Sequence, residues 1–177
     1  MKKFLIIGNL NSITYKDIFP FIKSNELWLG HNTNGHNMSF LLYDKMKDIA
    51  AVWITNLDYQ KRHIPLELHK HYKAEECPKY DNYDAINVDR VKDIPKDYNG
   101  VMGVPITFLE KYCPSQFEII GVFNRFHKLD EEKGQICGTP IGFTDKNGKT
   151  IIWNGPTVNK KSIYKRGLIR LKKGRSF

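Results

Sequence analysis

The sequence contains six histidines and three cysteines, residue types that can bind a metal. His69 and His71 are two residues apart, a spacing that would place both on one face of a strand. No cysteine or carboxylate stands beside them at zinc-ligand spacing, so we interpret the pair as exposed polar histidines and predict no metal site. Cys77, Cys113 and Cys137 are odd in number and form no C-x-x-C pair. This pattern argues against a disulfide scaffold and fits a reducing compartment.

The common catalytic motifs are absent from the sequence. It contains no P-loop, no G-x-G-x-x-G, no G-x-S-x-G and no H-E-x-x-H. The acidic pairs Glu75–Glu76 and Glu131–Glu132 lie beside lysines, which is typical of a solvated surface, and Cys113 is best interpreted as an inert thiol. The residues alone therefore indicate no reaction, and we predict no catalytic residue in this chain.

The positive charge is concentrated near the C-terminal end. The 177 residues have a formal charge of +9, from 28 Lys and Arg against 19 Asp and Glu. Ten of the basic residues follow Asp145, and no acid does, so the preceding sequence is close to neutral. An acid-free basic stretch favours a polyanionic partner such as nucleic acid. The alternative is a tail that only improves solubility.

The composition is that of a globular protein without a membrane or secretory segment. Hydrophobic residues make up 41% and charged residues 27%. No apolar run approaches the roughly 20 residues that span a bilayer. The run Phe4–Ile7 is too short for a signal peptide and polar residues follow at once. Together with the cysteine pattern, this predicts a cytoplasmic protein.

The first third of the chain predicts an α/β unit. Phe4–Ile7 is typical of a strand buried on both faces in a parallel sheet. Ser12 is placed to cap a helix that starts near Ile13 and that Pro20 must kink or restart. Leu27–Leu29 is predicted as the next strand, which completes a β-turn-α-β unit.

Two further strands are predicted at Ser39–Tyr43 and Ala50–Asn56. From Asp58 to Gly103 no periodicity is sustained, and tyrosines alternate with Lys, Asp, Asn and Pro. We interpret this stretch as an extended, loop-rich segment, a kind of segment that often has a function.

The last third predicts a short helix and several strands. The helix covers Pro105–Tyr112, and a strand follows at Phe117–Phe123. The turn signal D-K-N-G joins Ile141–Thr144 to Thr150–Trp153 in a hairpin. Ser162–Leu171 predicts a terminal strand with one apolar face and one cationic face. The cationic face carries Arg166, Arg170 and Lys172.

Several stretches are more specific than these patterns. They are K-K-F-L-I-I-G-N-L-N-S-I-T-Y-K-D-I-F (2–19), L-W-L-G (27–30), V-W-I-T-N-L (52–57), P-K-Y-D-N-Y-D-A-I-N-V (78–88), G-V-M-G-V-P-I-T-F-L (100–109), F-E-I-I (117–120) and Y-K-R-G-L-I-R (164–170). In this order they resemble adenine-specific DNA methyltransferases of the EcoRI modification-methylase type. The resemblance is weakest over residues 31–50 and 124–160.

The resemblance implies methyl transfer from S-adenosylmethionine to N6 of an adenine that has left the DNA stack. In that family an Asn-Pro-Pro-Phe motif carries the chemistry and a glycine-containing segment holds the cofactor. Both lie upstream of the part matched by residues 2–11, and this sequence has no Asn-Pro-Pro-Phe. We therefore expect the C-terminal part of such an enzyme, without a complete active site and without cofactor binding by this chain alone.

The expected fold is α/β, the C-terminal part of a Rossmann-like methyltransferase sheet. We expect one domain over 1–177, with a partial α/β core at 1–57 and a loop-rich target-recognition insert at 58–104. A closing helix, strands with a terminal hairpin, and the basic stretch form 105–177. An open apolar edge at Phe4–Ile7 would invite an N-terminal methyltransferase half or a second copy of the chain.

The resemblance also implies roles for two asparagines. Asn9 and Asn11 follow the first predicted strand, and ligands of open α/β sheets bind at the carboxyl ends of strands. They are candidates for the rim of the adenine pocket. The alternative is that they only make the turn and cap the helix.

The remaining candidates would contact double-stranded DNA. Tyr80 and Tyr83 would stack on a displaced base or read groove edges with Asn82 and Asn87, since Asn suits adenine N6 and N7. The alternative is a tyrosine-anchored loop packed on the core. The expected phosphate contacts are Lys79, Arg90, Lys92, Lys96, Lys160, Lys161, Lys165, Arg166, Arg170, Lys172, Lys173 and Arg175.

Two alternative functions stay open at this point. The chain could be a non-catalytic DNA-binding module, or the C-terminal half of a split methyltransferase that needs an upstream partner chain.

Overall fold

The computed structural model describes residues 2–30, 37–125, 132–144 and 150–172. Most elements are short strands. In chain order they are β1 (Leu5–Asn9), η1 (Leu10–Thr14), α1 (Phe19–Lys23), β2 (Trp28–Leu29), β3 (Asn37–Leu42), β4 (Lys45–Thr55), η2 (Gln60–His63), β5 (Ile86–Asn87), η3 (Val91–Asp93), β6 (Met102–Pro105), η4 (Ile106–Lys111), β7 (Phe117–Phe123), β8 (Gln135–Ile136), β9 (Ile141–Thr144), β10 (Thr150–Trp153), β11 (Thr157–Val158), β12 (Lys161–Ser162) and β13 (Arg166–Leu171). Mixed sheets with few helices are consistent with part of an α/β fold.

The first sheet has the order β1-β4-β2, and β3 pairs with the other end of β4. β1 and β2 are both antiparallel to β4, so they run in the same direction with β4 between them. η1 and α1 connect them, so the predicted β-turn-α-β unit is present. The expectation of a parallel neighbour for β1 is wrong among the described strands, because the later strand β4 inserts between the two.

β1 is an exposed edge strand. Leu5, Ile6 and Ile7 are 51%, 52% and 47% exposed. The prediction of a strand buried on both faces is therefore wrong in this structure. Its outer edge pairs with no other strand of the described residues, and part of its apolar surface stays open to solvent.

The turn after β1 is capped by Asn9 rather than by the predicted Ser12. The Asn9 backbone is extended, and its Oδ1 accepts a hydrogen bond from the Asn11 N–H at 2.8 Å. Ser12 instead donates its hydroxyl to the Asn9 carbonyl at 2.7 Å. Pro20 lies in the first turn of α1, which confirms that it restarts the helix.

β3 and β4 form a long hairpin that the sequence predicted only in part. The strand at Ser39–Tyr43 is confirmed within a residue or two, but β4 begins at Lys45, well before the predicted Ala50. Tyr43 and Asp44 make the two-residue turn with φ of 48° and 63°. Such left-handed turns favour Asn or Gly, so Tyr-Asp gave no hairpin signal.

The second sheet has the order β5-β6-β13-β7-β8, with β13 in the centre and antiparallel to β6 and β7. β7 covers the residues predicted for it, and β13 is the predicted terminal strand. The prediction of one cationic face on β13 is wrong for its middle, because Leu168 and Ile169 are both fully buried. A register shift lies between these two residues, and each packs into a different apolar cluster.

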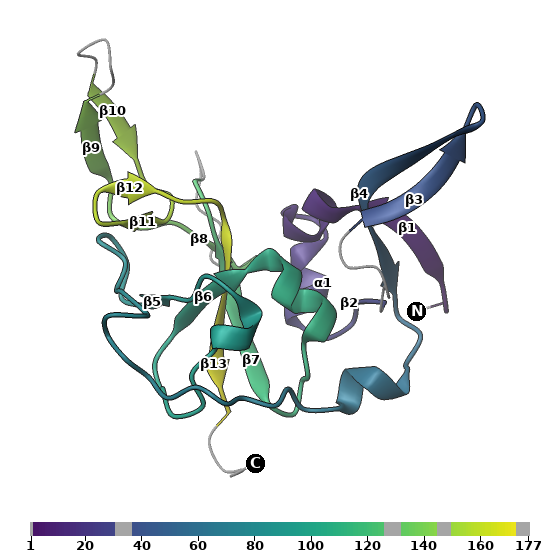
Figure 1. Ribbon diagram of the computed structural model, residues 1–177, viewed down its shortest axis with the longest axis horizontal. Coiled ribbons are helices and arrows are strands. Elements are labelled where there is room, and N and C mark those ends of the chain that lie inside the picture. Colours follow the sequence, from purple (N-terminus) through teal and green to yellow (C-terminus); the bar gives the residue numbers. More distant parts are fainter. Residues whose placement is uncertain (1, 31–36, 126–131, 145–149, 173–177) are drawn as a thin grey trace.

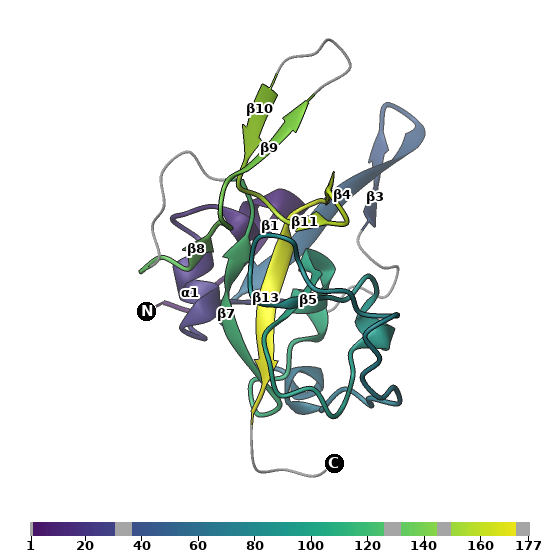
Figure 2. The ribbon, with the colours of Figure 1, turned by 90° about the vertical axis from the view of Figure 1, so that its left-hand side faces the viewer.

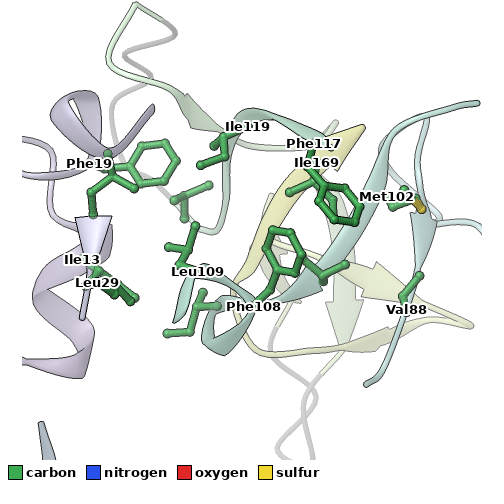
Figure 3. Packing of buried hydrophobic residues seen from close by; sticks show 14 of the residues in the cluster. Ile13, Phe19, Leu29, Val88, Met102, Phe108, Leu109, Phe117, Ile119 and Ile169 are labelled. Atoms are coloured by element: carbon green, nitrogen blue, oxygen red, sulfur yellow. The ribbon is translucent and has the colours of Figure 1, made fainter. Parts of the chain in front are cut away.

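One large apolar cluster joins the two sheets (Figure 3). Phe19 from α1 and Leu29 from β2 belong to it, as do Phe117 and Ile169 from the second sheet. The Phe108 ring of η4 meets Phe117 edge-on, with centroids 5.0 Å apart. The segment from 58 to 101 is mostly irregular, as predicted, yet it contributes buried Cys77, Ile86, Val88 and Ile94 to this core.

Two hairpins project toward the top of Figure 1, one on each side of the molecule, while the C-terminal end of β13 points toward the bottom. Figure 2 shows both hairpins on the same upper side. One is β3–β4 and the other is the predicted hairpin β9–β10, which the structure confirms. The predicted turn at 145–148 lies outside the described residues. No helix among the described residues is long and apolar enough to cross a membrane.

Candidate nucleic-acid interface

The turn after β1 meets the start of the basic C-terminal stretch. The Tyr164 hydroxyl donates to Asn11 Oδ1 at 2.7 Å, and Lys165 Nζ donates to Thr14 Oγ1 at 2.9 Å. The asparagine turn after β1 and the basic stretch, which we considered for different reasons, thus form one surface although they lie about 150 positions apart. Sequence reasoning did not single out Tyr164, which is the residue that joins them.

Asn9 and Asn11 use their side-chain oxygens within the protein. Asn9 caps η1 and Asn11 accepts the bond from Tyr164. This geometry matches the alternative in which Asn9 makes the turn. We still predict that both residues line the rim of an adenine pocket. There, only their side-chain amide N–H groups would be available for the base.

Lys165 is a partly buried cation. Burial lowers the pKa of its ammonium group from the ordinary value of a lysine. Its nitrogen also lies 5.5 Å from the centroid of the Tyr164 ring. An anion placed next to this ammonium group would offset the cost of its burial, so the site favours a phosphate or another negative group.

Three of the four predicted base-reading residues are buried. Tyr80, Asn82 and Asn87 are 5%, 6% and 4% exposed. The Tyr80 hydroxyl donates to Asn87 Oδ1 at 3.0 Å, and burial raises the pKa of this phenol. As they lie, these side chains cannot reach a base, so we correct their role from DNA contact to support of the loop. Tyr83 is half-buried against Phe123, with ring centroids 5.0 Å apart.

The buried asparagine supports the segments on either side of β9–β10. Asn82 Nδ2 donates to the carbonyls of Gly155 at 2.8 Å and Thr139 at 3.3 Å, and the backbone carbonyl of Asn82 accepts the Thr139 N–H at 2.9 Å. Its neighbour Asp81 accepts the backbone N–H groups of Asn159 and Lys160, at 3.2 and 2.7 Å. The loop at 78–84 therefore fixes the base of one hairpin and the turn of the next.

The predicted phosphate-binding residues fall into two groups. Several pair within the protein: Lys79 with Asp84, Arg90 with Asp93, Arg166 with Asn87 and Asp89, Arg170 with Glu118, and Lys172 with the Pro114 carbonyl. Within the described part of the chain, the side chains that are exposed and show no such partner are Lys92, Lys96, Lys160 and Lys161. Lys173 and Arg175 lie outside the described residues.

The cations of the C-terminal stretch also separate in space. Lys160 and Lys161 lie on the β11–β12 turn, near the end from which the hairpins project (Figure 1). Arg170 and Lys172 lie at the opposite end of β13, around an open pocket of about 470 Å³. The sheet therefore does not present both pairs of cations on one DNA-binding face.

The open pocket at the C-terminal end of β13 does not fit S-adenosylmethionine. The open pocket is lined by Asn99, Glu118, Arg170, Leu171 and Lys172, without an aromatic ring to stack on an adenine. At the turn after β1, both asparagine oxygens are already engaged. No three His, Cys, Asp or Glu side chains of the described residues come together as a metal site.

Sequence reasoning also missed a cation–π pair at the base of β9–β10. The Arg125 guanidinium lies over the Trp153 ring, 5.3 Å from its centroid. Gly155 packs so closely on this ring that a Cβ there would come within 2.8 Å of it. The sequence gives no signal for such contacts, because the partners are 28 residues apart and only the folded hairpin joins them.

Comparisons with known proteins agree on one family. The family described as "Adenine-specific methyltransferase EcoRI" matches residues 1–51 and 42–172. The type II methyltransferase M.EcoRI of Escherichia coli is 48% identical over 151 residues, which cover 75% of this chain and 45% of that protein. M.MgeORF184P of Mycoplasma genitalium and M.MpnI of Mycoplasma pneumoniae, also type II methyltransferases, are 37% and 36% identical over 153 residues. The chain spans about half the length of these relatives, and no solved structure matches it.

Proposed function

Because the chain belongs to the family of EcoRI adenine-specific methyltransferases, we propose that it is the C-terminal, DNA-recognising portion of such an enzyme. The parent reaction is the transfer of a methyl group from S-adenosylmethionine to N6 of adenine in duplex DNA. The portion consists of the last strands of a Rossmann-like sheet, the recognition loop at 58–104 and the closing sheet with its basic stretch.

The observation that carries DNA binding is the surface at the hairpin end of the molecule. Asn11 and Tyr164 join the turn after β1 to the basic stretch, and Lys165 is a partly buried cation there. Lys160 and Lys161 are exposed at the β11–β12 turn, which precedes Tyr164 in the chain. Phosphate oxygens are the anions that such lysines bind most readily on DNA.

This chain alone lacks a complete active site in our proposal. The sequence has no Asn-Pro-Pro-Phe, and the open pocket at the end of β13 does not fit the cofactor, which supports this proposal. The cofactor, bound elsewhere in the enzyme, supplies the electrophilic methyl group. The residues of this chain bind the duplex and orient it, so that the target base reaches a pocket completed by the rest of the enzyme.

The open strand β1 is the proposed docking site for the remaining half of the enzyme. Leu5, Ile6 and Ile7 are about half exposed, and the outer edge of β1 has unpaired backbone groups among the described strands. Adding a strand there would satisfy the backbone and cover part of the three side chains, which alternate between the two faces. The relatives are about twice as long as the matched region, which leaves room for such a half.

Salt-dependent DNA binding tests the proposal. We expect fluorescence anisotropy with a mixed-sequence duplex to show binding that weakens as salt rises. Replacing Lys160 and Lys161 together by Ala should reduce the log–log slope by about one to two units. The matched control is the Arg170→Ala, Lys172→Ala double variant, which removes the same charge at the opposite end and should change the slope less. Absence of wild-type binding even at low salt would overturn the proposal.

Methylation assays test the missing active site. The chain with labelled S-adenosylmethionine and DNA should give no N6-methyladenine, whereas adding the N-terminal half of M.EcoRI should restore turnover. Turnover by the chain alone would contradict the proposal. DNA binding without restoration would favour a non-catalytic DNA-binding module instead.

A further inference from the structure

The β9–β10 hairpin is a free two-stranded ribbon. Its strands pair with each other from Ile141–Trp153 to Thr144–Thr150 and with no other described strand. It projects from the body in both views (Figures 1 and 2). One face holds Gly142, Thr150 and Ile152, all exposed, with Ile152 at 67%. Paired residues and residues two apart share a face, so these three form one surface.

Gly142 is not required to be glycine by any described neighbour. Among the described residues, a Cβ built on it would meet only Thr150 Cγ2, at the ordinary contact distance of 3.6 Å, and its φ is not in the left-handed region. Glycine in a strand weakens it, so a strand glycine often marks a site where another molecule approaches closely. Here the space above Gly142 opens outward, beside the exposed Ile152.

The base of the ribbon is held firmly. The Gly138 N–H donates to the Asn154 carbonyl at 2.7 Å, and buried Asn82 binds segments on both sides of the ribbon. A Cβ on Gly138 would come within 2.5 Å of the Asn82 side chain, so the two backbones pack without a gap. The ribbon is therefore a positioned element rather than a loose loop.

Positive charge flanks the ribbon. Arg125 lies over Trp153 at its base, and Lys160 and Lys161 lie on the neighbouring β11–β12 turn. Described residues 135–144 and 150–165 include no acid. A nonpolar face between cations is complementary to a groove whose floor carries base edges and whose walls carry phosphates.

We propose that the β9–β10 ribbon enters the major groove of the recognised DNA, with Gly142 and Ile152 facing thymine methyl groups. This inference rests on the DNA-binding function proposed above. The major groove is about 12 Å wide and 8.5 Å deep and admits a two-stranded ribbon. Two strands about 4.8 Å apart fit this width when the ribbon lies along the groove, with the face of Gly142 and Ile152 toward the floor.

Thymine methyl groups give a direct test. The duplex that binds best is first selected from a random pool with the wild-type chain, and each thymine is then replaced by uracil. At the contacted positions the wild type should bind about fourfold more weakly per methyl group removed. Ile152→Ala should bind the thymine duplex more weakly and should not respond to uracil. Equal responses of the wild type and Ile152→Ala would overturn the proposal.

A second variant probes the space above Gly142. Gly142→Ala should leave the melting temperature unchanged or slightly higher, because the new Cβ makes only an ordinary contact with Thr150 among the described residues, yet it should weaken DNA binding. Binding equal to wild type would overturn a close approach at this position. Circular dichroism melting of each variant shows that the fold is intact.

Leu41→Ala on the other hairpin is the matched control. Leu41 is also 67% exposed and lies on a projecting two-stranded hairpin, so its truncation changes the same amount of surface. It should leave both affinity and the uracil response unchanged. If the wild type binds DNA and both Ile152→Ala and Gly142→Ala bind equally well, the proposed role of the ribbon is rejected and the proposed function is retained. Loss of all wild-type binding would instead reject the function.

Discussion

The central strands of the five-stranded sheet are covered on both faces. Phe117 in β7 and Ile169 in β13 are fully buried. In the sheet of β1, β4 and β2, by contrast, Leu5, Ile6 and Ile7 remain about half exposed on the edge strand. The apolar character of these strands is similar, so the difference lies in their neighbours. The closing sheet has its own partners within this chain, whereas the first sheet has a free edge that fits a partner outside it.

Truncation of a core aromatic residue should give the largest effect. Phe117→Ala removes a ring that packs edge-on against Phe108, and such substitutions cost about 3–5 kcal/mol. Urea denaturation of the purified chain measures the loss. A loss below about 1 kcal/mol would mean that the closing sheet is not the stable part of the molecule.

Removal of Arg62 should have an intermediate effect, because this residue ties the first sheet to the segment that follows it. Its guanidinium stacks on Trp28 at 3.8 Å, donates to Asn25 and lies 3.7 Å from Asp58, while its side chain is only 5% exposed. Arg62→Ala should destabilise the chain by about 1–3 kcal/mol.

Arg62→Lys is the informative companion. A lysine keeps the charge but lacks the planar group that stacks and forms several bonds, so it should restore little of the lost stability. Full rescue by lysine would show that charge alone matters at this position.

Truncation at the open strand should cost much less in the isolated chain. Ile6→Ala is expected to change the free energy of unfolding by less than about 1 kcal/mol, since half of this side chain already contacts water. The same variant should weaken association through β1, seen as a lower apparent mass in light scattering at high concentration. A strictly monomeric wild-type chain would leave the N-terminal half as the only proposed partner of this edge.

The smallest expected effect concerns acid stability of the loop-rich segment. The hydrogen bond from His71, then that from the Tyr72 N–H, holds the pKa of Asp97 below its usual 3.8. The carboxylate therefore stabilises the fold above pH 3.8, and this contribution is lost as the pH falls through the lowered pKa.

Asp97→Asn should make the melting temperature depend less on pH between about pH 5 and pH 2. Asp84→Asn, at a carboxylate that is 95% exposed, is the control. Identical pH profiles for Asp97→Asn and wild type would contradict the role of this pair.

Local features of the fold followed from the sequence where the signal was local. The apolar run at 117–123 predicted β7, and the D-K-N-G turn predicted the β9–β10 hairpin. The β3–β4 turn was missed because Tyr43 and Asp44 adopt left-handed conformations that their residue types rarely favour. The direction of β1 was missed because it depends on β4, which comes 40 residues later.

The charge of the candidate site was visible in the sequence, and its geometry was not. The acid-free stretch predicted phosphate contacts at Lys160, Lys161, Lys165, Arg170 and Lys172, which stay predictions. The separation of the last two residues from the others depends on the direction of β13. Tyr80 and Asn82 were chosen because polar aromatic loops often bind bases. Their burial results from contacts with Phe123 and Gly155, 43 and 73 residues away, and such contacts leave no trace in a local pattern.

The central position of β13 has a consequence for protein synthesis. β6 and β7 emerge from the ribosome before the strand that lies between them, and the 42 residues from 124 to 165 must be added first. At 5–20 residues per second this takes roughly 2–8 s. During that interval Val104 and Val122, fully covered in the finished sheet, have no β13 to shield them. At that stage the nascent chain therefore exposes unpaired strand edges and apolar side chains, the kind of surface that chaperones bind.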